Sequence, residues 1–187
     1  MDNEILSTEG KPSKSLLREV FDTVELLAIA ASVILLVFTL IARITVVDGS
    51  SMAKTLHSGD KLIVSDLFYT PSQGDIVIIQ SPAINHGEAI VKRVIAVGGD
   101  TVRLVRGAVY VNDVLLSEAD GSLGYVVLPE QNVDVGTYHL AEDEIFVLGD
   151  NRAISYDSGD FGPVDRRTVL GKVLLRIAPL RDFGTVN

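Results

Sequence analysis

The sequence predicts an all-β fold: mostly antiparallel sheets that form a compact β domain, preceded by a single N-terminal transmembrane helix. Two observations lead to this prediction. Residues 26–42 form a run of 17 residues without a charged side chain, close to the ~20 residues that cross a bilayer as a helix. From Lys61 onward the apolar runs are short, rich in Val and Ile, and separated by Gly, Pro, Asn and Asp, which is typical of strands joined by turns.

The N-terminal part divides into a tail and a membrane segment. Residues 1–25 are polar and mixed in charge, so we expect a flexible tail. Arg43 interrupts the apolar run, which then continues to Val47. Because a long basic side chain can reach the membrane surface, we expect one transmembrane helix over residues 26–47. A cleaved signal peptide would have a shorter apolar core followed by a small-x-small site, and a core helix fits a run without a polar face poorly. Three basic residues flank each side of the run, so charge does not decide the orientation.

The remaining domain, residues 48–187, is predicted to be built from strands. Turn residues separate short runs with alternating or continuous apolar character. We expect residues 118–136 to form a long loop and residues 149–162 to form a polar loop with little secondary structure of its own. The predicted strands cover residues 61–65, 75–80, 89–97, 101–105, 108–111, 114–116, 137–140, 144–148 and 171–177.

Composition excludes several classes of function. The formal net charge is −9, and a nucleic-acid partner would require a basic face. The chain has no cysteine, which excludes disulfides, thiolate catalysis and thiolate metal sites. The histidines lie far apart in the sequence, without the spacing of metal ligands, so we expect no metal and no cofactor. These are His57, His86 and His139.

A candidate nucleophile follows the apolar run. Residues 46–56 read Val-Val-Asp-Gly-Ser-Ser-Met-Ala-Lys-Thr-Leu, a hydroxyl-rich stretch where the membrane segment gives way to the folded domain. We interpret Ser51 as a nucleophile. A serine hydroxyl needs a base within hydrogen-bond reach. His57 lies six residues away, and a Ser-His-Asp triad stays open because triads are recognised by geometry.

Two lysines are alternative bases, since burial lowers a lysine pKa and favours the neutral form. Lys54 follows Ser51 at the serine-x-x-lysine spacing of penicillin-binding enzymes. The Ser-Asp-Asn and Lys-Thr-Gly partners of that chemistry are absent, so a solvated lysine is the better interpretation of Lys54. Lys92 is favoured because it lies within the predicted strand 89–97. Alternation places Lys92 and Arg93 on opposite faces, so one of them faces a packed surface while the other can point outward. An edge-strand lysine that blocks aggregation remains the alternative.

Four motifs in order connect these candidates. They are Gly-Ser-Ser-Met with Thr-Leu at 49–56, Gly-Asp-Ile-Val at 74–77, Lys-Arg-Val-Ile-Ala-Val-Gly-Gly-Asp at 92–100, and Gly-Asp-Asn-Arg-Ala-Ile-Ser-Tyr-Asp-Ser at 149–158, closed by Phe-Gly at 161–162. With this order, and with an apolar helix just before the serine, the chain resembles bacterial type I signal peptidase (leader peptidase). The resemblance covers residues 20–178, nearly the whole chain.

The resemblance implies a role for each matching residue. Ser51 would be the nucleophile, Lys92 the general base, and Ser155 the residue that orients the lysine amine. The Ser51 backbone N–H would bind the oxyanion. Gly49 stands where some family members add a hydroxyl, so a backbone donor has to suffice. Supporting roles in the last loop fall to Asp150, Asn151, Arg152 and Asp157.

The resemblance also implies substrate and location. The substrates would be signal peptides of exported preproteins, cut after small residues at Ala-x-Ala sites, with possible contact with the export machinery. The N-terminal tail would be cytoplasmic, residues 26–47 would be anchored in the lipid bilayer of the cell membrane, and the catalytic domain would be extracytoplasmic.

Two positions depart from the family pattern, and two other functions stay open. Lys54 stands where a Pro is common, which leaves the loop after Ser51 less rigid. Gly159 stands where an Arg is usual, so an ion pair with Asp157 is lost. One alternative is a catalytically inactive, membrane-anchored homologue that acts as an assembly scaffold or chaperone. A self-cleaving serine-lysine repressor is the other, but it would be cytosolic with a DNA-binding domain.

Overall fold

A computed structural model describes residues 16–105, 108–116 and 136–186, with the side chains of Leu17 and of residues 37–41 left aside. The chain forms two compact units, Met1–Leu40 and Ile41–Asn187. Most of the predicted loop at 118–136 lies outside the described residues.

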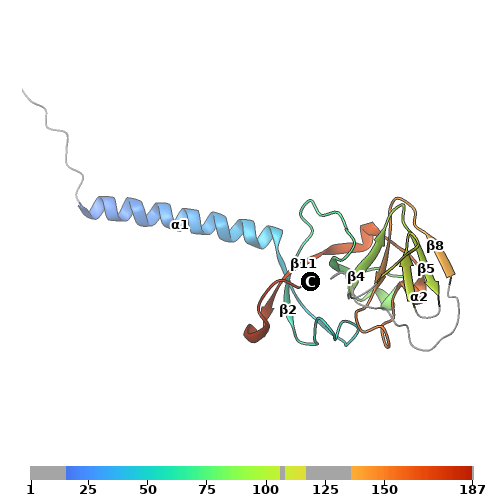
Figure 1. Ribbon diagram of the computed structural model, residues 1–187. Coiled ribbons are helices and arrows are strands. Elements are labelled where there is room, and N and C mark those ends of the chain that lie inside the picture. Colours follow the sequence, from blue (N-terminus) through green and yellow to red (C-terminus); the bar gives the residue numbers. More distant parts are fainter. Residues whose placement is uncertain (1–15, 106–107, 117–135, 187) are drawn as a thin grey trace, which may run out of the picture. The chain divides into compact units, whose positions relative to one another are not determined.

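The described part of the first unit is the long helix α1 (Leu16–Ile41), whose last residue belongs to the second unit (Figure 1). It begins ten residues earlier than the predicted membrane segment, so the expectation of a tail as far as residue 25 was wrong. Ser32 donates its hydroxyl to the Ala28 carbonyl at 2.8 Å, which satisfies a polar group inside the helix. Among the described residues, no helix combines the length and the apolar character that a membrane crossing requires. The predicted transmembrane helix is therefore not confirmed.

The predicted end of that helix was also wrong. Residues Arg43–Val46 form strand β1, which pairs antiparallel with β2 (Lys61–Ser65), and Ile44 lies opposite Ile63. Arg43 thus belongs to a sheet, and the Ile and Val that follow it supply a β-branched strand rather than the last turn of a helix.

The second unit consists of two antiparallel sheets (Figure 1). The larger sheet has the order β1-β2-β11-β3-β4-β9-β10, and every neighbouring pair is antiparallel. Besides β1 and β2, its strands are β3 (Ile76–Ile79), β4 (Ile90–Val97), β9 (Glu144–Leu148), β10 (Val164–Asp165) and β11 (Val169–Ala178). The smaller sheet has the order β7-β6-β5-β8. Its strands are β5 (Thr101–Val105), β6 (Ala108–Val111), β7 (Val114–Leu115) and β8 (Gly136–His139).

Short helical turns complete the unit. Among the residues that the structure describes, the helix α2 covers Ser158–Phe161, and 3-10 turns cover η1 (Asn85–Gly87), η3 (Arg166–Thr168) and η4 (Leu180–Asp182). The all-β, mostly antiparallel class is confirmed, and all nine predicted strands are present within two residues at each end. Strands β1 and β10 and the helix α2 were not predicted.

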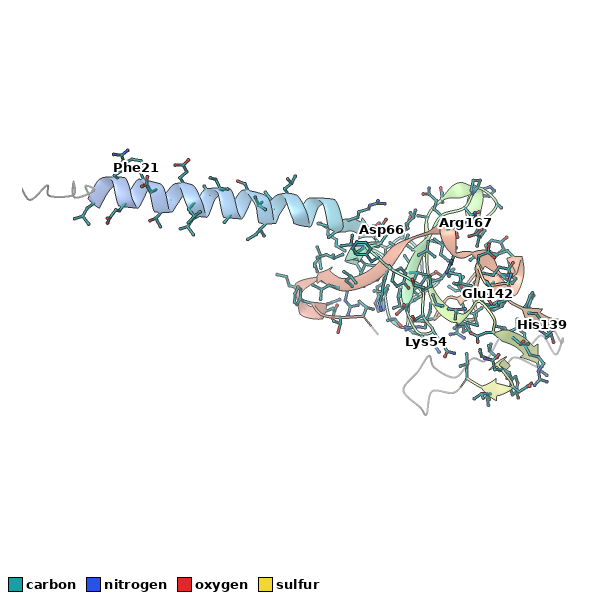
Figure 2. The ribbon with its side chains drawn as sticks, turned by 90° about the horizontal axis from the view of Figure 1, so that it is seen from above. Phe21, Lys54, Asp66, His139, Glu142 and Arg167 are labelled. Carbon is teal, nitrogen blue, oxygen red and sulfur yellow. The ribbon has the colours of Figure 1, made fainter. Side chains whose placement is uncertain are left out.

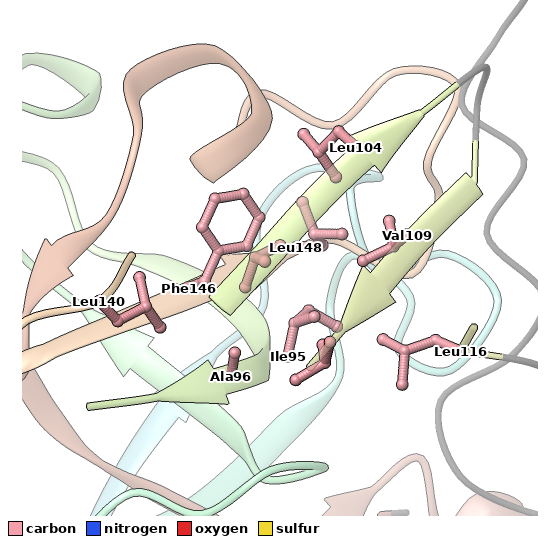
Figure 3. Packing of buried hydrophobic residues seen from close by; sticks show 10 residues of the cluster. Ile95, Ala96, Leu104, Val109, Leu116, Leu140, Phe146 and Leu148 are labelled. Carbon is pink, nitrogen blue, oxygen red and sulfur yellow. The ribbon is translucent and has the colours of Figure 1, made fainter. Parts of the chain in front are cut away.

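Three clusters of buried side chains hold the unit together. One cluster joins the two sheets through Phe146 and Ile95 of the larger sheet and Leu104 and Val109 of the smaller one (Figure 3). A second cluster contains Met52 and Leu56, one and five positions after Ser51 in the sequence, and packs them against Leu62, Ile76 and Val173. A third contains Val77, Val94 and Val147. The second cluster is the one that fixes the candidate nucleophile to the sheet.

Candidate active site

Strand β4 buries two adjacent basic side chains in the interior of the larger sheet. It lies between β3 and β9, so the alternative of an edge-strand lysine was wrong. Lys92 is 2% exposed and Arg93 is 6% exposed. The prediction that one of the two could point outward was also wrong, because both faces of this sheet are covered at β4.

The Ser51 turn, residues 50–56, is a compact loop with its own hydrogen bonds. The Ala53 N–H donates to the Ser50 carbonyl at 3.1 Å, and the Leu56 N–H donates to the Met52 carbonyl at 2.7 Å. Met52 and Leu56 are buried. Since Met52 and Leu56 anchor the loop in the core, the half-buried Ser51 is fixed relative to the larger sheet. Gly49, just before the turn, has φ +90°, a conformation that favours glycine.

A second loop, residues 149–157, closes over the Ser51 turn. Asn151 donates its backbone N–H to the Ser51 carbonyl at 2.8 Å and its side-chain amide to the Ser50 carbonyl at 3.0 Å. A Cβ built on Gly149 would lie 2.2 Å from the Ser155 hydroxyl oxygen and 2.6 Å from the Ser51 carbonyl oxygen. Only a glycine therefore allows Ser51 and Ser155 to approach each other at this point.

The Lys92 amine is bound by this second loop. Its Nζ lies 3.0 Å from the Ser155 hydroxyl oxygen. The Ser155 side chain also bonds the Asp157 carboxylate. Burial lowers the pKa of Lys92, against the opposing charges of Asp157, Asp160 and Asp150. The environment thus favours the neutral amine that proton abstraction needs.

Asp157 is a buried carboxylate that accepts hydrogen bonds from the backbone of the loop around it. It accepts the N–H of Gly149 at 3.0 Å and the N–H of Gly159 at 3.1 Å. Burial raises the pKa of Asp157, although these hydrogen bonds and the nearby Lys92 oppose the rise. Asp157 therefore joins the start of α2 to Gly149, at the centre of the site.

Asp150 and Arg93 form a two-pronged ion pair next to Lys92. The Arg93 Nε and Nη2 donate to the two carboxylate oxygens at 2.8 and 2.7 Å. Burial alone would raise the pKa of Asp150, but the bonds and charge of Arg93 bring it below its ordinary value. The Thr55 hydroxyl donates to the same carboxylate, which ties the Ser51 turn to strand β4. Arg152 is buried and contributes positive charge to Asp150.

The alternative bases lie outside this environment. Lys54 and His57 are both exposed, and Figure 2 shows the Lys54 side chain at the periphery of the unit. Neither residue lies in the buried surroundings that hold Lys92 and Ser155. His86 and His139 are also exposed. Within the described ranges, no group of three or more His, Asp or Glu is arranged to hold a metal ion.

A family model described as signal peptidase, peptidase S26, matches residues 20–178. The chain belongs to this family. The resemblance inferred from the four motifs is therefore confirmed, and the chain is a serine peptidase.

Curated relatives match the sequence of this chain over most of its length. A probable signal peptidase I-2 of Synechocystis is 35% identical over 156 residues, or 80% of this chain and 69% of the relative. A probable signal peptidase I-1 of the same organism is 30% identical over 188 residues, or 96% of this chain and 93% of the relative. The crystal structure of a signal peptidase I from Enterococcus faecalis is 30% identical and covers 56% of this chain and 97% of its own, with a TM-score of 0.41.

The structure describes the surroundings of both positions that depart from the signal peptidase pattern, Gly159 and Lys54. Gly159 donates its N–H to Asp157, and a Cβ there would lie 3.3 Å from the Asp157 Oδ1. Asp157 is therefore held by backbone N–H groups and the Ser155 hydroxyl. The arginine expected at position 159, which would pair with Asp157, is replaced by Gly159. Lys54 is exposed in the Ser51 turn and leaves the hydrogen bonds of Met52 intact.

Sequence reasoning missed several residues that shape the site. Thr55 and Gly149 both lay in the quoted motifs, but their roles depend on contacts with residues about 100 positions away, namely Asp150 and Ser51. The hydroxyl of Ser158 is fully buried and accepts the Val147 N–H at 3.0 Å. Arg176 and Asp60 carried no motif signal.

Proposed function

We propose that this signal peptidase family member is an endopeptidase that removes signal peptides from exported preproteins, with Ser51 as nucleophile and Lys92 as general base. One observation carries the proposal. Lys92 is 2% exposed, its amine donates to the Ser155 hydroxyl oxygen at 3.0 Å, and the loop that carries Ser155 also bonds the Ser51 carbonyl. A desolvated lysine next to a turn that presents a serine is the arrangement that serine-lysine catalysis needs.

The first step forms an acyl-enzyme. Neutral Lys92 takes the hydroxyl proton as the Ser51 oxygen attacks the scissile carbonyl carbon, and a tetrahedral oxyanion forms. When it collapses, the carbon–nitrogen bond breaks and Lys92 gives its proton to the leaving amine, the new amino terminus of the mature protein. The hydrogen bond that Lys92 donates to the Ser155 hydroxyl oxygen holds the amine in place between the transfers.

The second step releases the signal peptide. Lys92 takes a proton from water, the hydroxyl oxygen attacks the ester carbon, and the Ser51 oxygen leaves with the proton that Lys92 returns. The oxyanion in both steps is stabilised by the Ser51 backbone N–H. Gly49 offers no side-chain donor, so the contribution of the backbone is the larger one here.

The substrate pairs as an added strand, with alternate side chains in shallow pockets that suit small residues of Ala-x-Ala sites. Support comes from β1, which is an edge strand of the larger sheet and ends five residues before Ser51. Its Ile44 and Val46 side chains are exposed. An extended peptide along such an edge would be led directly to the nucleophile.

We also propose that the chain associates with a lipid bilayer, with the tail cytoplasmic and the second unit extracytoplasmic, near the export machinery. Apolar side chains on α1 are exposed, including Phe21 (Figure 2) and Leu26. In the second unit, Phe68 is 98% exposed with φ 50°, in a turn closed by the Tyr69 N–H and the Asp66 carbonyl. Exposed apolar groups of this kind indicate an apolar partner. Flotation with anionic vesicles tests the association, and protease protection of an N-terminal tag tests the orientation.

Cleavage of a preprotein with an Ala-x-Ala site tests the catalytic assignment. We expect wild type to cut after the second Ala, with the new amino terminus identified by mass spectrometry, and we expect Ser51→Ala and Lys92→Met to be inactive. Lys54→Met and His57→Ala are matched controls and should cleave normally. If a folded wild type left every preprotein intact, the peptidase assignment would be abandoned for the scaffold alternative. Normal cleavage by Lys92→Met would show that another residue is the general base.

A further inference from the structure

Arg176 of β11, which pairs with β2 in the larger sheet, contacts the end of the Ser51 turn. Its Nη1 donates to the Thr55 carbonyl at 3.1 Å and to the Asp60 carboxylate at 3.2 Å. Its Nε donates to the Asp182 carbonyl at 2.7 Å. A guanidinium with three donor contacts in a fixed fork orients its acceptors more tightly than a point charge can.

Asp60 is the buried partner in this contact. Its side chain is 5% exposed, and it also accepts the His57 N–H at 3.0 Å. The main chain of Asp60 closes the same segment, because its carbonyl accepts the Val47 N–H at 2.9 Å. The Arg176–Asp60 pair therefore fixes the chain both before and after the Ser51 turn.

Thr55 is held from two sides. Its carbonyl accepts from Arg176, while its hydroxyl donates to Asp150, which Arg93 binds with two hydrogen bonds. Two arginine–aspartate pairs thus converge on one residue, four positions after Ser51. Truncating either partner of a buried pair leaves the other unpaired, so both pairs constrain where the turn can lie.

We propose that Arg176, with Asp60, is a positioning pair for the nucleophile: it locks Thr55 and thereby sets the Ser51 hydroxyl within reach of Lys92. The inference rests on the proposed role of Ser51. It accounts for how a turn with Lys54 in place of a ring-constrained residue stays ordered. Small misplacements of a reacting group can lower a rate by about 100-fold.

The same contacts make the C-terminal segment part of the site's support. The backbone of Arg176 exchanges two hydrogen bonds with Gly184, at 2.8 and 3.1 Å. Val186 packs against the cluster that contains Met52 and Leu56. Residues 180–186 therefore help to hold the arginine in place.

Steady-state cleavage by the full chain tests the proposal with Arg176→Lys, Arg176→Met and the double variant Arg176→Met/Asp60→Asn. The double variant keeps an acceptor for His57 and leaves no unpaired buried carboxylate, so it guards against a single variant that does not fold. We expect kcat to fall by about 10- to 100-fold in the Met variants, with less loss in Arg176→Lys and with KM unchanged. Arg181→Met is the matched control, because Arg181 is 84% exposed and bonds only the Asp182 carboxylate among the described contacts.

Amide hydrogen exchange supplies a readout that does not depend on activity. In Arg176→Met, the Thr55 and Leu56 N–H groups should exchange faster while the amides of β4 and β9 keep wild-type rates. A role in overall stability alone would speed exchange throughout and lower kcat only through the unfolded fraction. Wild-type kcat together with wild-type exchange at Thr55 would overturn the positioning role. An inactive wild type would instead contradict the proposed function. The exchange rates at Thr55 and Leu56 would still show whether Arg176 and Asp60 hold the Ser51 turn in place.

Discussion

At Lys92, the burial that lowers the lysine pKa also destabilises the folded state. The unfolded chain carries this lysine with its ordinary pKa of 10.5, while the folded pKa is lower. Between the two values the unfolded state binds more protons, so stability rises with pH across that window and the full penalty applies below it. Each pKa unit of difference is worth about 1.4 kcal/mol.

We therefore expect Lys92→Met to abolish cleavage and to raise the free energy of unfolding at neutral pH. Urea unfolding of variant and wild type at about pH 7 and about pH 10 measures this, because the window in which the cost fades ends at the ordinary pKa of 10.5. The advantage of the variant should shrink at the higher pH, because the cost of neutralising the lysine fades there. An advantage that stayed constant with pH would show that packing, and not protonation, is responsible.

Gly149 is a second position where the site depends on a single atom, the Cβ that glycine lacks. An added Cβ would lie 2.2 Å from the Ser155 oxygen and 2.6 Å from the Ser51 carbonyl oxygen. We expect Gly149→Ala to lose stability by about 1–3 kcal/mol and to lose most of its kcat, because Ser155 has to leave Lys92. Thermal unfolding and kinetics would be measured against Gly159→Ala, whose Cβ would lie 3.3 Å from one carboxylate oxygen. Equal activity in the two variants would contradict this account.

The sequence allowed the pair Lys92 and Arg93 to be placed on opposite faces of a strand, since alternation is a local property. It could not show that both faces are covered, because that depends on which strands lie beside β4. Likewise, Ser155 was assigned through the resemblance alone. Its hydrogen bond to Lys92 spans 63 residues of sequence, a separation that no local pattern encodes.

At the scale of elements, strands bounded by turn residues were predictable. Residues 61–65 and 101–105 match β2 and β5 in full, since apolar periodicity and Gly or Asp punctuation both mark their ends. Strand β1 was missed because Arg43–Val46 continues an apolar run and becomes a strand only by pairing with β2. The two-residue strand β10 has no period to detect, and it exists through its pairing with β9.

The helix α2 was missed because it has four residues and depends on its cap. Asp157 accepts the Gly159 N–H, while Asp160 accepts the Asp157 N–H at 3.0 Å, which together form a capping box. We expect Asp160→Asn to cost about 1 kcal/mol or less of unfolding free energy. Because the Asp160 charge raises the pKa of Lys92, its removal should also shift the acid limb of the kcat/KM profile to lower pH. Asp143→Asn, with an exposed carboxylate before β9, is the control and should leave the profile in place.

At the scale of the whole molecule, the site depends on long-range contacts inside the second unit. The Ser51 turn comes before β2, Lys92 lies on β4, and Ser155 follows β9. The larger sheet brings them together because β11, near the end of the chain, inserts between β2 and β3. All of its strands, and all the residues assigned to catalysis, lie within Ile41–Asn187.

A chain that lacks residues 1–40 should therefore keep the fold and the chemistry. Because the second unit has its own core, we expect the urea midpoint of its unfolding to be unchanged. It should cleave a soluble Ala-x-Ala peptide with the kcat/KM of the full chain, whereas flotation with anionic vesicles should fall because the exposed apolar groups of α1 are gone. Phe68→Ser in the full chain is the matched comparison, since it removes one exposed apolar group and keeps α1. Loss of peptide cleavage on truncation, with the β-sheet circular dichroism intact, would mean that α1 takes part in the site itself.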